Sequence, residues 1–219
     1  MDQFEIQNNI RDPRVDYSAP PLDEDALDAD PIRQFLHWYG EASAAGVAEP
    51  NAMTLCTVDA EGSPDARMVL LRGCGADGFH FYSSDRSAKG LQIAAGSGAA
   101  LVFYWAQQHR QVRVRGPVVR LSRELAAEYW ATRPRGSQAA AWASRQSAPV
   151  ASREELERDC EAVEQRFSGV DIPPPDDWAG YTVQPDAVEF WQGREFRLHD
   201  RVRYRRKGDS GWLRERLAP

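Results

Sequence analysis

A short stretch near the C-terminus combines side chains that can bind an anion and move a proton. It contains Trp191, Arg197, His199 and Arg201 within eleven residues. The last three lie two residues apart, and side chains at that spacing share one face of a β-strand. Three cationic or titratable groups in a row repel one another unless an anion lies opposite. The pattern therefore indicates a site for a phosphorylated ligand, with His199 available for proton transfer. A solvated basic strand edge is the alternative, and spacing alone does not exclude it.

A second group of polar side chains surrounds a predicted turn from a strand into a helix. Ser83, Ser87 and Lys89 supply two hydroxyls and an ammonium group there, and Arg67 and Arg72 flank the preceding apolar strand. Free N–H groups at a helix N-terminus bind phosphate, and hydroxyl and ammonium groups strengthen such a site. Ordinary capping of the helix by Ser87 explains that serine equally well.

A third group lies at a predicted helix end and in the loop that follows. Tyr129, Arg133 and Ser137 are spaced four residues apart, which places neighbours on one helix face, although Pro134 ends the helix before Ser137. The spacing is compatible with a second anionic site. It is equally compatible with a surface pair of Tyr129 and Arg133.

The composition limits the class of protein. The chain has 219 residues, 42% of them hydrophobic, and a formal net charge of −6, which predicts one domain with a sizeable core and no nucleic-acid partner. The three cysteines are far apart in the sequence and form no metal-binding spacing, so we expect free thiols and no metal. Neither a signal peptide nor a membrane-spanning run is recognisable, and we expect a cytoplasmic protein without membrane contact.

The elements that must position these groups can be read along the chain. Residues 1–29 are acidic and rich in proline, and we expect a flexible N-terminal arm before a single domain at 30–219. A helix should begin after Asp30, with Pro31 in its first turn, and end near Gly46. Its apolar face is predicted to consist of Ile32, Phe35, Leu36 and Tyr39.

The rest of the chain alternates between strands and helices. Strands are predicted at 53–58, 66–72, 79–82, 99–105 and 111–121, and two or three more in the last forty residues. Helices are predicted at about 87–95, 122–132 and 152–168. β-Hairpins with helices set around them indicate an α+β barrel.

Eight separate motifs, in the same order, resemble the pyridoxamine 5′-phosphate oxidase family. They are RMVLL at 67–71, FYSS at 81–84, SAKG at 87–90, RQV at 110–112, RPRGSQ at 133–138, ASRQS at 143–147, WQGREFRLHDR at 191–201 and RLAP at 216–219. The resemblance implies an FMN-binding split β-barrel with flanking helices that forms a homodimer and holds FMN between subunits. The activity that it implies is oxidation of pyridoxamine and pyridoxine 5′-phosphate by oxygen, which gives pyridoxal 5′-phosphate and hydrogen peroxide.

The same resemblance assigns roles to individual residues. Arg197 and His199 would lie over the substrate ring as catalytic residues. The FMN contacts would be Arg67, Met68, Val69, Leu70, Leu71, Arg72, Tyr82, Ser83, Ser87, Lys89, Gln111, Gln146, Ser147, Trp191 and Arg201. The substrate would contact Arg14, Tyr17, Arg72, Tyr129, Arg133, Ser137, Arg197 and His199, with Arg14 and Tyr17 closing over it from the N-terminal arm.

Two positions depart from many relatives, which carry lysine in place of Arg72 and arginine in place of Ala88. Arg72 keeps the charge but changes the hydrogen-bond geometry, whereas Ala88 removes a candidate phosphate contact. Two other functions therefore stay open at this point: a related FMN oxidase of another substrate, such as a phenazine precursor, and a flavin- or pyridoxal-phosphate-binding protein without turnover.

Overall fold

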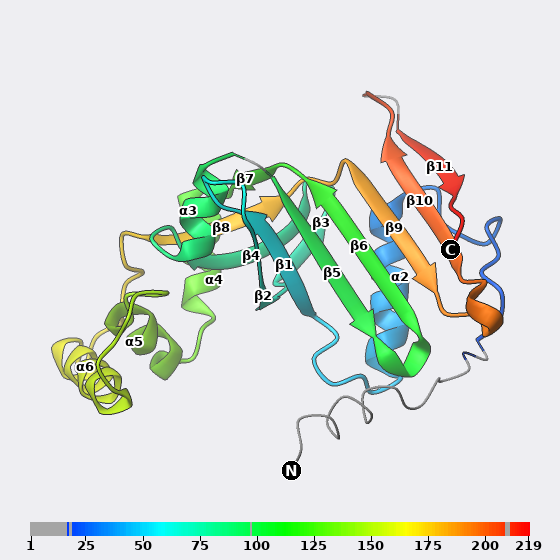
Figure 1. Ribbon diagram of the computed structural model, residues 1–219. Helices are drawn as coiled ribbons and strands as arrows, with labels where there is room; N and C mark the ends of the chain where they lie inside the picture. The colour runs from blue at the N-terminus through cyan, green and yellow to red at the C-terminus, as the bar shows by residue number, and fades with distance from the viewer. Residues whose placement is uncertain (1–16, 18, 97, 209–210) are drawn as a thin grey trace, which may run out of the picture.

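The computed structural model describes residues 17, 19–96, 98–208 and 211–219. Within these residues the strands form two antiparallel sheets (Figure 1), one in the order β11-β10-β9-β6-β5-β1-β2 and a smaller one in the order β3-β4-β8-β7. The strands are β1 Ala52–Val58, β2 Pro64–Leu70, β3 Gly73–Gly75, β4 Gly78–Ser84, β5 Ala99–Trp105, β6 Arg110–Gly116, β7 Val118–Arg120, β8 Trp178–Val183, β9 Ala187–Gln192, β10 Asp200–Arg206 and β11 Trp212–Arg216. The helices are α2 Pro31–Ala44, α3 Ala88–Ala94, α4 Arg123–Ala131, α5 Arg135–Ala143 and α6 Arg153–Arg166, with 3-10 turns η1 Ala106–Gln108 and η2 Glu195–Arg197.

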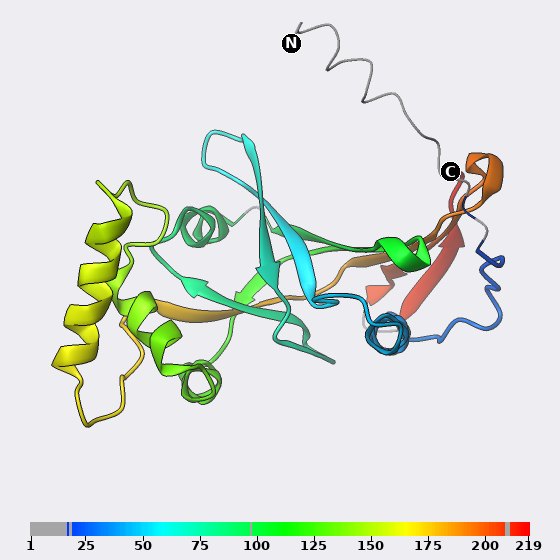
Figure 2. The same cartoon turned by 90° about the horizontal axis from the view of Figure 1, so that it is seen from below.

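The main hydrophobic core is shared by both sheets and by α2, which Figure 2 shows almost end-on beside the strands. As predicted, Asp30 caps α2, and its carboxylate accepts a hydrogen bond of 2.8 Å from the backbone N–H of Ile32. Phe35 is completely buried and contacts the rings of Phe79 and Phe103. The prediction that Leu36 belongs to the apolar face of α2 was wrong, since its side chain is 45% exposed. Trp38 is buried in the core instead.

One predicted strand, 111–121, is two strands that belong to different sheets. The chain leaves the large sheet after β6 and enters the small sheet with β7. Pro117 lies between them and has no N–H for a sheet hydrogen bond. A Cβ atom on Gly116 would lie 1.8 Å from the carbonyl oxygen of Gln184, so only glycine allows the two backbones to approach this closely. Periodicity did not reveal this break because Val112, Val114 and Val118 continue the same alternation across it.

The prediction that one strand carries Arg197, His199 and Arg201 is also wrong. Residues 195–197 form the turn η2, and β10 begins only at Asp200. Phe196 and Arg197 have φ angles of 55° and 62°, in the left-handed region. Because the backbone turns here, a spacing of two no longer places side chains on one face. Among the described residues after 177 there are four strands, β8 to β11, in place of the predicted two or three.

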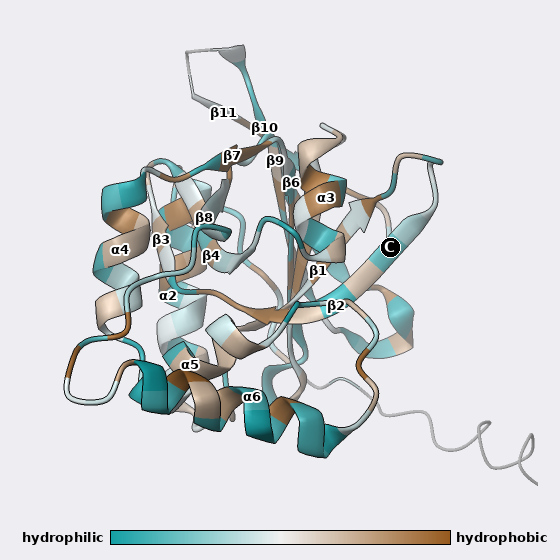
Figure 3. Cartoon of the chain, turned by 90° about the vertical axis from the view of Figure 1, so that its left-hand side faces the viewer, coloured by the Kyte–Doolittle hydropathy of each residue, from teal (hydrophilic) through white to brown (hydrophobic). Residues whose placement is uncertain are grey.

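A second, smaller core lies around α4, α5 and α6, away from the main one. It is built on Trp130, Ala139 and Ile172, with Trp142 and Phe167 packed against it. Helix α5 was missed in the sequence: Pro134, which was expected only to end α4, also provides the start of α5. Figure 3 shows that the surface of α6 is largely hydrophilic, in agreement with its absence from the main core.

Part of the predicted flexible arm is bound to the barrel. The backbone N–H of Leu22 donates to Asp200, and the guanidinium of Arg216 contacts both Glu24 and Asp200. Further along, the hydroxyl of Tyr204 donates to the carbonyl of Asp28 over 2.8 Å. The described residues from 19 to 28 are thus held at the β10–β11 hairpin, so contacts with the barrel begin before residue 30. No helix among the described residues is long and apolar enough to cross a membrane.

Candidate active site

An open cavity of about 250 Å³ lies where β2, β4, α3 and α4 meet. All of its lining residues were predicted from the sequence: Arg67, Met68, Val69, Leu70, Arg72, Tyr82, Ser83, Lys89, Tyr129, Arg133 and Gln146. Four of these are cations, so the cavity is suited to an anionic ligand. We refer to it below as the phosphate cavity. Leu71 is excluded from it, because that side chain is only 8% exposed and belongs to the main core.

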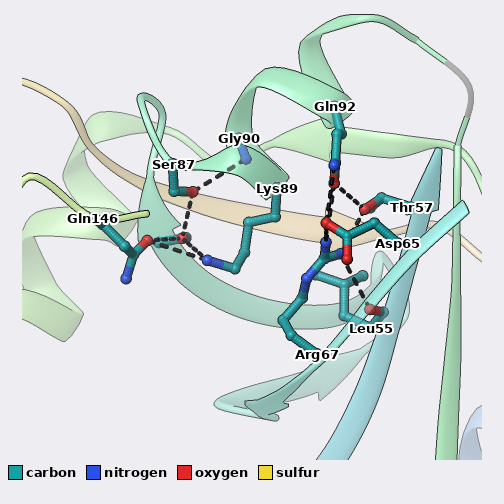
Figure 4. A network of polar contacts seen from close by, with 10 residues as sticks. Leu55, Thr57, Asp65, Arg67, Ser87, Lys89, Gly90, Gln92 and Gln146 are labelled. Atoms are coloured by element: carbon teal, nitrogen blue, oxygen red, sulfur yellow. Dashed lines mark hydrogen bonds and ion pairs between the residues drawn. The ribbon is translucent and has the colours of Figure 1, made fainter. Parts of the chain in front are cut away.

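Arg67 lies on β2, the edge strand of the large sheet, and a set of polar groups encloses its guanidinium (Figure 4). Nη1 donates to the hydroxyl of Thr57 over 2.5 Å and to the carbonyl of Leu55 over 3.2 Å. Nη2 donates to Asp65 and, over 3.0 Å, to the amide oxygen of Gln92. The guanidinium is therefore fixed before any ligand binds.

Lys89 approaches the same cavity from α3. Its ammonium group donates to the hydroxyl of Ser83 over 3.3 Å and to the amide oxygen of Gln146 over 3.2 Å. Burial, together with repulsion from Arg67, lowers the pKa of Lys89. Ser87 does not reach the cavity: it is completely buried and caps α3 by accepting from the N–H of Gly90. The capping alternative for Ser87 is the one that the structure shows.

The other side of the cavity is aromatic and basic. Tyr82 and Tyr129 stack with their ring centroids 4.0 Å apart, and Trp178 lies nearly parallel to both. The guanidinium of Arg133 lies 4.5 Å from the Trp178 ring centroid, and that of Arg72 lies 5.8 Å from the Tyr129 centroid. Tyr129, one of the three residues predicted from their spacing of four, thus has Arg72 and Tyr82 as neighbours.

The guanidinium groups of Arg72 and Arg133, on this side of the cavity, have N–H donors that no described residue accepts from. Nε of Arg133 is buried without a hydrogen-bond partner in the described part of the chain. Arg72 forms no ion pair with any described carboxylate, so its charge is available to an anionic ligand. A buried donor without an acceptor is costly in a folded protein. An anionic ligand in the cavity would satisfy both groups.

Ser137 lies within α5, rather than in the loop where it was expected. Its carbonyl accepts a hydrogen bond of 2.9 Å from Arg133. Both residues line a second cavity of about 300 Å³, which also contains Tyr82, Ser83 and Gln146 and so adjoins the first. Ser147 lines neither cavity and has a φ angle of 72°.

Three predicted FMN contacts lie elsewhere, in a row across the large sheet. Gln111 on β6 pairs with Trp191 on β9, and Trp191 pairs with Arg201 on β10. Residues in register on neighbouring strands point to the same face of the sheet. We call these three residues the cross-strand row. Glu189 accepts a hydrogen bond of 2.8 Å from Nε of Arg201, and Ala218 accepts one through its carbonyl.

Of the two predicted catalytic residues, His199 lies against Trp191, the middle residue of this row. The ring centroid of His199 is 4.7 Å from that of Trp191 and 5.7 Å from that of Tyr17. Nδ1 of His199 accepts from the backbone N–H of Arg194 over 3.1 Å, which leaves Nε2 as the free ring nitrogen. Burial and the charge of Arg197 lower the pKa of His199, so the neutral ring is favoured. Arg14 lies outside the described residues.

The phosphate cavity and the cross-strand row are far apart within one chain. In the large sheet β1, β5 and β6 lie between β2 and β9. Four interstrand spacings of about 4.8 Å therefore separate Arg67 from Trp191, roughly 19 Å in all. One chain brings each group together internally, but it does not bring the two groups to one place.

Several residues near these groups were not identified from the sequence. Thr57, Asp65 and Gln92 enclose Arg67, and their positions relative to it depend on strand pairing and on the packing of α3. Trp178 stacks beside Tyr82, and His109 contacts Tyr17. Gln92 lies three residues after Lys89, and that helical spacing was the one available signal. The described residues contain no cluster of side chains that could hold a metal.

Two family models match the chain. One describes pyridoxamine 5′-phosphate oxidase and covers residues 40–167; the other describes the C-terminal dimerisation region of pyridoxine 5′-phosphate oxidase and covers residues 178–219. The chain belongs to the pyridoxine/pyridoxamine 5′-phosphate oxidase family. The resemblance noted in the sequence is thereby confirmed, and the two models together cover residues 40–167 and 178–219.

Individual relatives agree with this assignment over almost the full length. The pyridoxine/pyridoxamine 5′-phosphate oxidase of Rubrobacter xylanophilus is 53% identical over 94% of each chain, and that of Salinibacter ruber is 49% identical over 97% of this chain and all of its own. The crystal structure of PhzG from Burkholderia lata in complex with tetrahydrophenazine-1-carboxylic acid has a TM-score of 0.86 and 29% identity, and covers 92% of this chain and all of that one. The predicted split-barrel fold is confirmed.

Proposed function

We propose that this chain is an FMN-dependent oxidase that converts pyridoxamine 5′-phosphate and pyridoxine 5′-phosphate into pyridoxal 5′-phosphate, with oxygen as the acceptor. The proposal is supported by near-full-length relatives of about 50% identity that carry this activity in their names. The observation that carries it is the convergence of Arg67, Arg72, Lys89 and Arg133 on one cavity with an unpartnered Nε on Arg133. A cofactor and a substrate that each bear a phosphate fit that excess of positive charge.

The cofactor phosphate would be held by Arg67, Ser83 and Lys89. The substrate phosphate would be held by Arg72 and Arg133 with the hydroxyl of Tyr129. When bound, FMN supplies the redox chemistry, because it can accept a hydride from the substrate and pass electrons to oxygen. The protein contributes orientation and charge, as cavity residues fixed by hydrogen bonds need little rearrangement when a ligand arrives.

His199 and Arg197 would act on the ring end of the substrate. With Nδ1 engaged by the backbone of Arg194, the neutral His199 ring can donate a hydrogen bond or transfer a proton only through Nε2. Arg197 lies in the η2 turn, exposed to solvent, where its guanidinium can reach an anionic oxygen on a ligand. Tyr17 packs against His199 and would cover the ligand from the N-terminal side.

We propose further that the active unit is a cytoplasmic homodimer and that each site combines two copies. The C-terminal 178–219 segment matches the family's dimerisation region. The sheet face that carries the cross-strand row also presents Tyr104, 54% exposed, and Met68, 63% exposed. A two-fold axis would place the row of one copy over the phosphate cavity of the other, which a single chain does not achieve.

The central test is oxygen consumption by the purified protein with pyridoxine 5′-phosphate, accompanied by identification of the flavin. We expect a yellow protein that releases FMN and not FAD on denaturation, and that forms hydrogen peroxide in proportion to oxygen consumed. FAD in the released flavin would contradict the site, because the GCGADG run at 73–78 lies in the β3–β4 hairpin and not at the strand-to-helix turn that a GxGxxG dinucleotide motif requires. Flavin binding without oxygen consumption would instead support a flavin- or pyridoxal-phosphate-binding protein without turnover.

A phenazine-related oxidase is the second candidate, because the PhzG structure is so similar in fold. The arrangement of Arg72, Tyr129 and Arg133 around one cavity favours a phosphorylated substrate instead. Parallel assays with pyridoxine 5′-phosphate and a reduced phenazine carboxylic acid would decide between them. Turnover of the phenazine compound alone would reject the vitamer assignment.

A further inference from the structure

The guanidinium of Arg67 is held by residues that belong to neither of the predicted sites. Thr57 comes from β1, Asp65 from β2 and Gln92 from α3, and all three contact Arg67 directly (Figure 4). With the carbonyl of Leu55 they occupy both terminal nitrogens of the guanidinium. Arginine has five N–H donors, four of which are on these terminal nitrogens. Nε has no hydrogen-bond partner among the described residues and is the donor left for a ligand.

Gln92 is the centre of this arrangement. Its amide oxygen accepts from Arg67 over 3.0 Å and from the hydroxyl of Thr57 over 2.5 Å. Its amide nitrogen donates to Asp65 over 3.0 Å, and Asp65 in turn contacts Arg67. The four side chains thus form a closed ring of hydrogen bonds. Removal of Gln92 would leave Arg67 with fewer constraints and Asp65 without the donor that Gln92 supplies.

The same glutamine also connects the two sides of the phosphate cavity. Gln92 lies three residues after Lys89, so both side chains project from one face of α3. Lys89 and Arg67 are two of the cations that line the cavity. The ring therefore fixes the strand β2 against the helix α3, and with them the separation between the two cations.

We propose that Gln92, supported by Thr57 and Asp65, is a positioning residue that holds Arg67 in the orientation required by the phosphate of FMN. The inference rests on the proposed function, because it takes Arg67 as a ligand of that phosphate. An arginine that is already fixed loses little side-chain freedom on binding, so affinity is higher than with a mobile one. The effect should be limited to flavins that carry a phosphate.

The test compares FMN with riboflavin, which has the same ring system and no phosphate. Full-length protein freed of flavin is titrated with each ligand, and binding is followed by quenching of flavin fluorescence. Gln92→Met keeps the length of the side chain and removes both hydrogen-bonding groups. We expect its dissociation constant for FMN to rise about tenfold, with that for riboflavin unchanged. Gln165→Ala, on the exposed α6, is the matched control and should change neither constant.

Two further variants separate the possible failures. Arg67→Ala should weaken FMN by more than Gln92→Met does; if it leaves FMN binding unchanged, the proposed phosphate site itself is wrong. Thr57→Val removes one hydroxyl and should weaken FMN in the same direction by a smaller factor. If Arg67→Ala weakens FMN while Gln92→Met and Thr57→Val have no effect, or affect both flavins equally, the positioning role alone is overturned.

Discussion

The phosphate cavity and the cross-strand row differ in how they are completed. The cavity is built where two sheets and two helices of one chain meet, and Arg67, Lys89 and Arg133 are fixed by hydrogen bonds within that chain. The row lies on an open face of the large sheet, and beside it Arg197 is exposed to solvent. Binding of phosphate groups can therefore be organised by one chain. The ring chemistry that we assign to His199 and Arg197 requires a second surface opposite the row.

The largest effect is expected from residues beside the row. Arg197→Ala and His199→Ala should each lower turnover by roughly a hundredfold, because correct placement of groups at the reacting atoms contributes factors of that order. FMN content should stay near that of the unchanged protein, since the cavity is intact. Turnover comes from oxygen consumption and flavin content from absorbance. Near-normal turnover in either variant would show that the substituted residue does not take part in the reaction.

A change in the cavity should act on affinity instead. Arg72→Ala should weaken binding of pyridoxine 5′-phosphate by about ten- to a hundredfold, the loss of one charge-assisted contact of roughly 1.5–3 kcal/mol. Arg72→Lys keeps the charge and should weaken binding of pyridoxine 5′-phosphate only slightly. Titration of both variants with pyridoxine and its phosphate provides the control. Equal losses for the two ligands would show that Arg72 does not contact the phosphate.

Mixing two inactive variants tests whether the regions belong to different copies. Arg67→Ala damages the cavity and Arg197→Ala damages the region of the row. In a mixed dimer one site receives both defects and the other receives none. After dissociation and reassociation of an equal mixture, half of the dimers are mixed, so about one quarter of full activity should return. If activity stays at the level of the separate variants, each site is made by one chain.

The smallest effect concerns pH. The folded protein lowers the pKa of His199 below its ordinary value of 6.5, through burial and Arg197. The unfolded chain therefore binds a proton more readily, and this contribution to stability is present above pH 6.5 and declines as pH falls below it. His199→Asn should lose less stability than the unchanged protein between pH 7 and 5, measured by urea unfolding. An equal or greater loss would contradict the lowered pKa.

The sequence predicted the cavity better than it predicted the row. Motifs at 67–72, 82–89 and 129–146 are short and local, and most of the site residues predicted within them do line one cavity. The prediction failed where the backbone changes direction, as at η2, where positive φ angles at Phe196 and Arg197 end the alternation of a strand. Ser87 was ambiguous for a different reason, because a cap and a phosphate ligand need the same side chain at the same place.

By itself the sequence determined the set of cationic and aromatic residues and the α+β class, because these depend on residue type and local periodicity. The order of its motifs determined the family, and the resemblance to that family implied the split-barrel fold. The tertiary structure decided which of them meet. Pairing of β6, β9 and β10 places Gln111, Trp191 and Arg201 in one row. Packing of α3 against β2 brings Gln92 to Arg67, and the sheet holds the row and the cavity apart. Distances between segments remote in sequence follow from strand register and helix packing, and the linear spacing of residues does not contain them.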